Sequence, residues 1–174
     1  MSCNRRIKTK LSTPYYATQD LNMSELLKNE ERFLVATKCC ILVQGKILIL
    51  GEKVRDTIHW ELPGGKISKK DKEKEIISSL EREVLEELWL NLSPQDTPKI
   101  FHIQKSYEKA FHSDDILPFI FICYLIELDY FPEINLSDEH TIYRWINQSE
   151  IDNISPWRIQ FDTIVKKAFE IKPI

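Results

Sequence analysis

The chain has 174 residues, of which 43% are hydrophobic and 29% are charged, and its formal net charge is -3. This length suits one domain, and this composition is that of a globular protein that can bury a core. The slightly negative balance argues against a general nucleic-acid binder, because such proteins present a basic surface.

The N-terminal residues carry a small basic cluster, Arg5, Arg6, Lys8 and Lys10, that no long apolar run follows. The pattern is therefore not that of a secretory or twin-arginine signal. The longest nearly apolar run, Ile116 to Ile126, contains Pro118 and is too short to span a bilayer. We expect a cytoplasmic protein without a membrane partner.

The domain organisation is expected to be simple. Residues 1–33 are interpreted as an N-terminal arm with a short helix at 24–32, for which Ser24 is the cap. Residues 34–174 are interpreted as one globular domain. Three of the four cysteines, Cys39, Cys40 and Cys123, lie in apolar runs and are expected to be reduced core residues.

Apolar patterns in the globular part predict strands, a helix, more strands and a last helix. The helix expected at 71–88 has an apolar stripe that includes Leu80, Val84 and Leu88. The last helix is expected to start with Ser155 as its cap and Pro156 at its first position. The expected strands are a hairpin over 34–50 with a turn at 44–46, then 60–62, 100–107, 119–130 and 143–146. This order predicts an α+β or α/β/α layered domain rather than a doubly wound sheet.

Three glutamates of the predicted helix form an acidic patch. Glu83, Glu86 and Glu87 stand at positions i, i+3 and i+4, so their side chains share one helix face. Magnesium would offset their mutual repulsion, because this hard cation is bound by carboxylate oxygens and water. Acidic patches are also common on plain solvated surfaces, so the patch needs a second feature before it indicates a site.

The second feature is Pro63-Gly64-Gly65-Lys66, which lies before that helix. Adjacent glycines allow unusual backbone angles and let an amide or carbonyl group approach a ligand closely. The same residues also make ordinary turns, so the motif carries weight only together with the helix.

Together the two features resemble the signature of the Nudix hydrolase family, G-x5-E-x7-R-E-U-x-E-E-x-G-U, where U is a bulky aliphatic residue. The matching segments are Trp60-Glu61-Leu62-Pro63-Gly64-Gly65-Lys66-Ile67 and Arg82-Glu83-Val84-Leu85-Glu86-Glu87. The resemblance covers roughly residues 34–170, with Gly45-Lys46 upstream and Glu139 and Trp145 downstream. It implies an α/β/α sandwich in which a mixed β-sheet lies between helices.

The resemblance implies a metal site on the predicted helix. Glu83, Glu86 and Glu87 would bind Mg²⁺, with Mn²⁺ as the alternative ion, and the Gly65 carbonyl would be a further ligand. Glu86 or Glu87 would instead act as the base toward the attacking water. Arg82 would orient a glutamate through a charge-assisted hydrogen bond.

Further roles follow for residues outside the helix. Gly64, Gly65 and Lys66 are expected to bind the substrate. Glu139 is the candidate for an additional catalytic acid in a later loop, and Asp114 and Asp115 are the next candidates.

The chain departs from the signature at both ends of the helix. The segment before Arg82 is three residues longer than the family spacing, so Asp71, Glu73 or Glu75 could each fill the early glutamate position. Trp89 stands where the family has glycine. That glycine usually takes a left-handed conformation, which is costly for tryptophan, so we expect the helix to end differently, at Asn91.

The implied function is magnesium-dependent hydrolysis of a diphosphate bond in a nucleoside diphosphate linked to another moiety. A triphosphate, an ADP-ribose-type compound and a dinucleoside polyphosphate all remain open as substrates. The expected partner is a nucleotide-type small molecule rather than a polymeric nucleic acid, and a homodimer is left open. The alternatives are a catalytically silent nucleotide-binding module of the same fold and an unrelated α+β interaction domain.

Overall fold

The computed structural model describes residues 31–71, 73–109, 116–158 and 161–171. Contacts between residues divide the chain into Met1–Arg32 and Phe33–Ile174, and the fold below is that of the second unit. The helix expected at 24–32 falls almost wholly outside the described residues, so it stays a prediction.

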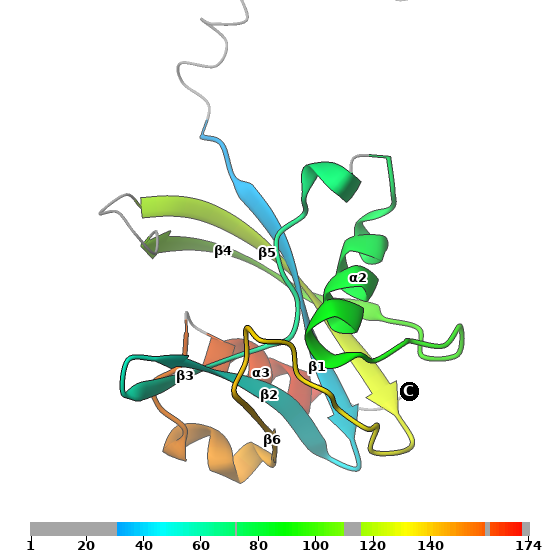
Figure 1. Cartoon of the computed structure of the whole chain (residues 1–174), viewed down its shortest axis with the longest axis vertical. Helices are drawn as coiled ribbons and strands as arrows, with labels where there is room; N and C mark the ends of the chain where they lie inside the picture. The colour runs from blue at the N-terminus through cyan, green and yellow to red at the C-terminus, as the bar shows by residue number, and fades with distance from the viewer. Residues whose placement is uncertain (1–30, 72, 110–115, 159–160, 172–174) are drawn as a thin grey trace, which may run out of the picture. The chain divides into compact units, whose positions relative to one another are not determined.

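The strands and helices of Figure 1 follow the expected order. Strands β1 (Leu34–Val43) and β2 (Lys46–Val54) form the expected hairpin. Gln44 and Gly45 at its turn have φ angles of 47° and 75°, a geometry that matches the twist of a tight hairpin. The other elements are β3 (Thr57–Glu61), the 3-10 helix η1 (Lys69–Asp71), α2 (Ile76–Leu88), β4 (Lys99–Lys109), β5 (Ile116–Leu128), β6 (Ile142–Ile146), the 3-10 helix η2 (Gln148–Asn153) and α3 (Phe161–Glu170).

The six strands form one mixed sheet in the order β3-β2-β1-β5-β4, and β6 also pairs with β2. β1 and β5 are parallel, and the other pairs are antiparallel. Leu80, Val84 and Leu88 of α2 join the apolar cluster on one face of the sheet. Phe161, Ile164 and other residues of α3 join the cluster on the other face. These layers confirm the predicted α/β/α sandwich.

A gap between two central strands makes room for the glycine motif. β1 and β2 pair only at Leu42–Ile47 and Val43–Lys46 and then diverge. The segment that follows β3 pairs with the free edge of β1 instead: the Cys39 N–H donates to the Pro63 carbonyl at 2.9 Å, and the Thr37 N–H donates to the Gly65 carbonyl at 2.9 Å. The motif is therefore fixed to the sheet rather than placed in a loose turn.

Three expectations about the helices were wrong. α2 begins at Ile76 rather than at Asp71, which belongs to the short η1 turn. α3 begins at Phe161, and Ser155 and Pro156 lie in the irregular segment before it. α2 ends at Leu88, the end of the expected range, but Trp89 itself, rather than Asn91, ends the helix, in the left-handed conformation with φ 55° and ψ 26°. Trp89 is 72% exposed, so its indole ring packs little against the rest of the protein.

Two further expectations concern burial and membranes. Cys39, Cys40 and Cys123 are free and buried, as the sequence predicts. In the described ranges, no helix is both long enough and apolar enough to cross a membrane.

Candidate active site

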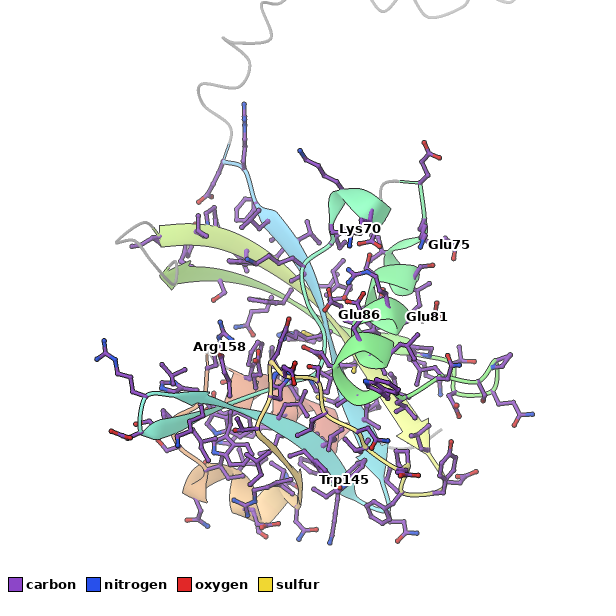
Figure 2. All side chains as sticks on the ribbon, in the orientation of Figure 1. Lys70, Glu75, Glu81, Glu86, Trp145 and Arg158 are labelled. Carbon is purple, nitrogen blue, oxygen red and sulfur yellow. The ribbon has the colours of Figure 1, made fainter. Side chains whose placement is uncertain are left out.

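The acidic face of α2 is aligned by the apolar stripe of the same helix. Leu80, Val84 and Leu88 are fully buried against the sheet, which fixes the rotation of the helix about its axis. The three glutamates then differ in exposure: Glu86 is exposed, Glu83 is half-buried and Glu87 is only 5% exposed. Figure 2 shows Glu86 beside the helix. The three carboxylates therefore run from solvent into the protein.

Gly64 brings the backbone to the buried glutamate. Its φ of 115° is rare for residues with a side chain, and a Cβ atom there would collide with the Thr37 carbonyl oxygen. In this position the Gly64 N–H donates a hydrogen bond of 2.7 Å to Glu87 Oε2. Glycine is thus required both by the paired edge of β1 and by the approach to Glu87.

Gly65 makes room for a second glutamate. A Cβ atom on Gly65 would lie 2.5 Å from the Glu83 carboxylate, so a side chain there would displace that group. The Gly65 carbonyl oxygen accepts the Thr37 N–H and keeps one lone pair for another partner. The glycine motif and the acidic face of α2 therefore form one site.

The environment raises the pKa of both Glu87 and Glu83. Burial raises the pKa of Glu87 to about 7, although the charge of Lys38 and the hydrogen bond from Gly64 act in the opposite direction. Burial also raises the pKa of Glu83, against the opposing charge of Arg82. A carboxyl group with a pKa near neutrality can take up and release a proton under physiological conditions.

Arg82 contacts one of the three candidates for the early acidic position. Its Nε and Nη2 atoms donate to the Asp71 carboxylate at 3.3 and 3.1 Å. The Ser68 N–H and hydroxyl group donate to the same carboxylate, both at 2.9 Å. Glu73 and Glu75 are exposed. Hydrogen bonds from Arg82 and Ser68 hold the pKa of Asp71 well below its usual range. Among the three candidates, the described contacts of Arg82 therefore favour Asp71.

The donor atoms around Arg82 fit a divalent cation. Arg82 Nη1 lies 2.9 Å from Glu83 Oε1 and 2.8 Å from Glu86 Oε2, so both carboxylates already converge on one positive charge. Carboxylate and carbonyl oxygens are the ligands that Mg²⁺ and Mn²⁺ accept. In this conformation, no three acidic, His or Cys side chains of the described chain surround a common point. Glu83, Glu86 and the Gly65 carbonyl are the groups in this site that could hold such an ion.

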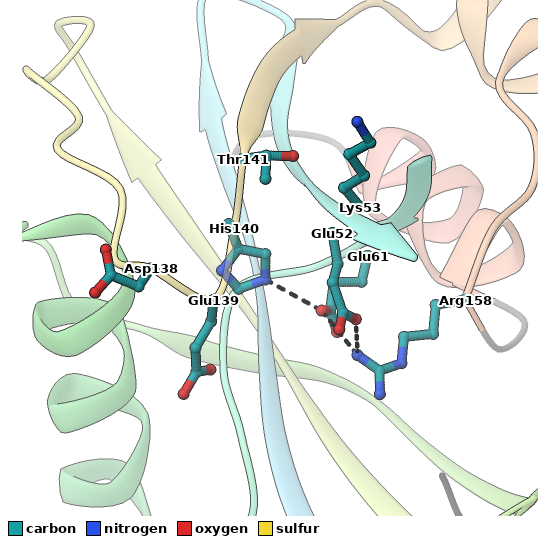
Figure 3. A pocket seen from close by; sticks show the side chains of 8 residues that line it. All are labelled: Glu52, Lys53, Glu61, Asp138, Glu139, His140, Thr141 and Arg158. Carbon is teal, nitrogen blue, oxygen red and sulfur yellow. Dashed lines mark hydrogen bonds and ion pairs between the residues drawn. The ribbon is translucent and has the colours of Figure 1, made fainter. Parts of the chain in front are cut away.

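Two expected site residues, Lys66 and Glu139, lie outside α2. The Lys66 ammonium group is 5.8 Å from the centre of the Phe119 ring. Glu139 is exposed in the loop 137–141, and Figure 3 shows it at a cavity of about 410 Å³. The Ser137 N–H donates to the Glu87 carbonyl at 3.0 Å, so this loop begins beside the end of α2. Asp114 and Asp115 lie outside the described residues.

Sequence reasoning missed a buried ionic cluster beside the site. Glu61, which is 6% exposed, contacts Lys38, His140 and Arg158. A lysine within the apolar run Ala36–Val43 was a signal that the strand contains a buried charge with a partner. Nothing in the sequence indicated which acid is that partner.

Comparisons with known proteins agree with this geometry. A model of the NUDIX domain family matches residues 32–167. The MutT NUDIX hydrolase of Burkholderia pseudomallei has a TM-score of 0.61 at 20% identity, covering 80% of this chain and 98% of that chain. The NUDIX domain of Shewanella oneidensis NrtR complexed with ADP ribose has a TM-score of 0.64 at 15% identity, covering 84% and 96%.

A Caenorhabditis elegans Ap4A hydrolase has a TM-score of 0.58 at 17% identity, covering 77% of this chain and 93% of that chain. Identities this low show a common fold and no common substrate. No curated protein matches the chain in sequence. The family match alone covers well over half of the chain, so the protein belongs to the NUDIX domain family, and this membership supports a Nudix-type pyrophosphohydrolase.

Proposed function

We propose that the protein hydrolyses a diphosphate bond in a nucleoside diphosphate linked to another moiety, with Mg²⁺ as its cofactor and Mn²⁺ as a substitute. The observation that carries the proposal is the contact between the two signature parts. The Gly64 N–H binds Glu87, and Glu83 lies against Gly65. The glutamates of a plain solvated helix surface would not make such contacts with the backbone of another segment.

Each residue has a part in the proposed chemistry. Glu83, Glu86 and the Gly65 carbonyl would hold the cation, which when bound would neutralise phosphate charge and acidify water. Glu87 joins them as a ligand or takes the proton of the attacking water, for which its pKa of about 7 is suited. The water oxygen bonds to one phosphorus, the bridging P–O bond breaks, and the phosphate-bearing group leaves. Gly64 and Lys66 contact the substrate phosphates, and Glu139 is a second candidate base.

A catalytically silent nucleotide-binding module is the alternative function. One of the structural relatives is a NUDIX domain complexed with ADP ribose, so binding without a stated reaction is compatible with the fold. The two departures from the signature give this alternative little support. Asp71 contacts Arg82, and Trp89 takes the conformation that the family glycine usually provides. An unrelated interaction domain is excluded by membership of the family.

A hydrolysis screen tests the proposal. Triphosphates, ADP-ribose-type compounds and dinucleoside polyphosphates are incubated with the protein and Mg²⁺, Mn²⁺ or a chelator, and the products are separated by chromatography. Glu86→Gln and Glu87→Gln are compared with Glu81→Gln, because Figure 2 places Glu81 and Glu86 on different sides of α2. We expect metal-dependent cleavage by wild type and Glu81→Gln and a large loss in the other two. Equal background rates in all four proteins, with nucleotide binding retained, would establish the silent module instead.

A further inference from the structure

Glu61 is a buried carboxylate outside the helix that carries the signature glutamates. It is the last residue of β3 and comes shortly before the glycine motif. Its Oε2 atom accepts a hydrogen bond from Lys38 Nζ at 3.1 Å. Its Oε1 atom lies 3.1 Å from His140 Nε2 and 3.2 Å from Arg158 Nη1. Figure 3 shows the last two contacts as dashed lines.

The partners of Glu61 come from three separate parts of the chain. Lys38 is on β1 and also donates to the Leu62 carbonyl at 2.9 Å. His140 belongs to the loop 137–141, and Arg158 belongs to the segment before α3. The carboxylate thus joins the central strand, a surface loop and the C-terminal segment at one point.

Glu61 is ionised in this environment. Burial disfavours its charge, but Lys38, the hydrogen bond with His140 and Arg158 outweigh that effect and hold the pKa of Glu61 below its ordinary value. An ionised carboxylate only accepts hydrogen bonds, so His140 Nε2 carries the shared proton. Removing one partner from such a buried cluster leaves the others uncompensated, which is costly.

The loop 137–141 is held at both ends by backbone hydrogen bonds. The Ser137 N–H donates to the Glu87 carbonyl at 3.0 Å, and the Thr141 N–H donates to the Gly51 carbonyl at 2.9 Å. Between them, Glu139 is exposed and His140 is buried. In Figure 3 the Glu139 side chain extends away from Glu61 on the side of α2. The contact between His140 and Glu61 therefore fixes the middle of the loop, next to Glu139.

We propose that Glu61 is a positioning residue for the reaction, because it holds His140 and thereby keeps Glu139 in place in the loop that begins beside the end of α2. This inference rests on the proposed function, in which Glu139 is a second candidate base. If Glu61 had a purely structural role, it would only balance the positive charges of Lys38 and Arg158. Its removal would then have no effect on catalysis through Glu139.

Two measurements on Glu61→Gln separate these roles. Glu52→Gln is the matched control, because Glu52 binds Arg158 at 2.7 Å, whereas the His140 side chain is bound by Glu61. By hydrogen exchange, we expect residues 137–141 of Glu61→Gln to exchange about 10-fold faster than in the control, with α3 unchanged. In the hydrolysis assay, we expect kcat to fall about 10-fold and KM to change less than about 3-fold.

A double-mutant cycle gives the sharper result. If Glu61 acts through Glu139, Glu139→Gln should lower kcat by a much smaller factor in the Glu61→Gln background than in wild type. Additive losses, or unchanged exchange in residues 137–141, would overturn the inference. If Glu61→Gln does not fold, His140→Ala removes the loop's side of the contact and is held to the same outcomes.

The failure of this inference can be told from the failure of the proposed function. An active wild type in which Glu61→Gln behaves like Glu52→Gln refutes the positioning role and leaves the function intact. An inactive wild type refutes the function, and the positioning role in catalysis is refuted with it, whatever the hydrogen exchange shows.

Discussion

Glu87 and Glu61 are buried to almost the same degree, with 5% and 6% of their surface exposed, but their partners differ. Glu87 receives one backbone N–H, and burial raises its pKa to about 7. Glu61 has Lys38, His140 and Arg158 around it, and they hold its pKa below the ordinary value. The comparison shows that the partners of a buried carboxylate, and not its burial alone, decide whether it is charged.

The difference matches the two tasks that we assign to these residues. A carboxyl group that exchanges its proton near neutral pH is suited to accept a proton from water. It is equally suited to give up its proton when a cation binds. A group that stays ionised is suited to hold other residues in fixed positions. Lys38 belongs to both environments, because its charge also opposes the rise in the pKa of Glu87.

The largest effect is expected when Glu87 can no longer ionise. Glu87→Gln keeps the size of the side chain and removes the carboxylate that binds the cation or accepts the proton of the attacking water. We predict a loss of about 10³-fold in kcat, while Glu81→Gln on another side of α2 stays near wild type. Steady-state kinetics with Mg²⁺ decide this. Activity of Glu87→Gln within about 10-fold of wild type would remove Glu87 from the reaction.

The two glycines sharpen the comparison, because they support the site in different ways. A Cβ atom at Gly64 meets rigid backbone at a positive φ, whereas one at Gly65 meets the flexible end of Glu83. We predict that Gly64→Ala lowers the free energy of unfolding by about 2–4 kcal/mol. Gly65→Ala should fold with a nearly normal Tm but lose most activity. Thermal denaturation and kinetics of both variants check this, and equal losses of stability would contradict it.

A smaller effect is expected at Arg82, which binds Glu83 and Glu86. Asp71→Asn weakens the hydrogen bonds between Arg82 and residue 71 and leaves the contacts of Glu87 and Glu61 unchanged. We predict a loss of about 10-fold in kcat or in metal affinity, as is typical when a supporting contact is removed. Glu73→Gln and Glu75→Gln are the matched controls, because they change the other candidates for the same position. If either control loses as much kcat or metal affinity as Asp71→Asn, the assignment of Asp71 fails.

The smallest effect is expected at the end of α2, where neither buried carboxylate is involved. Trp89→Gly removes an exposed side chain and relieves its left-handed conformation. We predict a gain of about 0.5–1 kcal/mol in the free energy of unfolding and unchanged kinetics. Chemical denaturation measures the gain. A clear loss of stability would show that the indole ring makes contacts of its own.

Much of the site could be predicted because it depends on local pattern. The stripe Leu80-Val84-Leu88 fixes the face on which Glu83, Glu86 and Glu87 lie, and adjacent glycines indicate a close backbone approach. The starts of α2 and α3 could not be predicted, because capping and proline signals also occur in the irregular segments that precede them.

The cluster around Glu61 was beyond sequence reasoning for another reason. Its contacts join residues that are 23, 79 and 97 positions apart. These residues meet only when the sheet, the loop 137–141 and the segment before α3 come together. The choice of Asp71 over Glu73 and Glu75 likewise depends on the η1 turn, which the helical pattern concealed.

The charge states of the two buried carboxylates are tested most directly by following their ¹³C carboxyl resonances by NMR as the pH changes, in the metal-free protein. Glu87→Gln and Glu61→Gln spectra assign the signals. We predict that Glu87 titrates near pH 7 and that Glu61 does not titrate between about pH 4 and pH 9. A midpoint for Glu87 near the ordinary value of about 4.3, or titration of Glu61 within that range, would contradict the account.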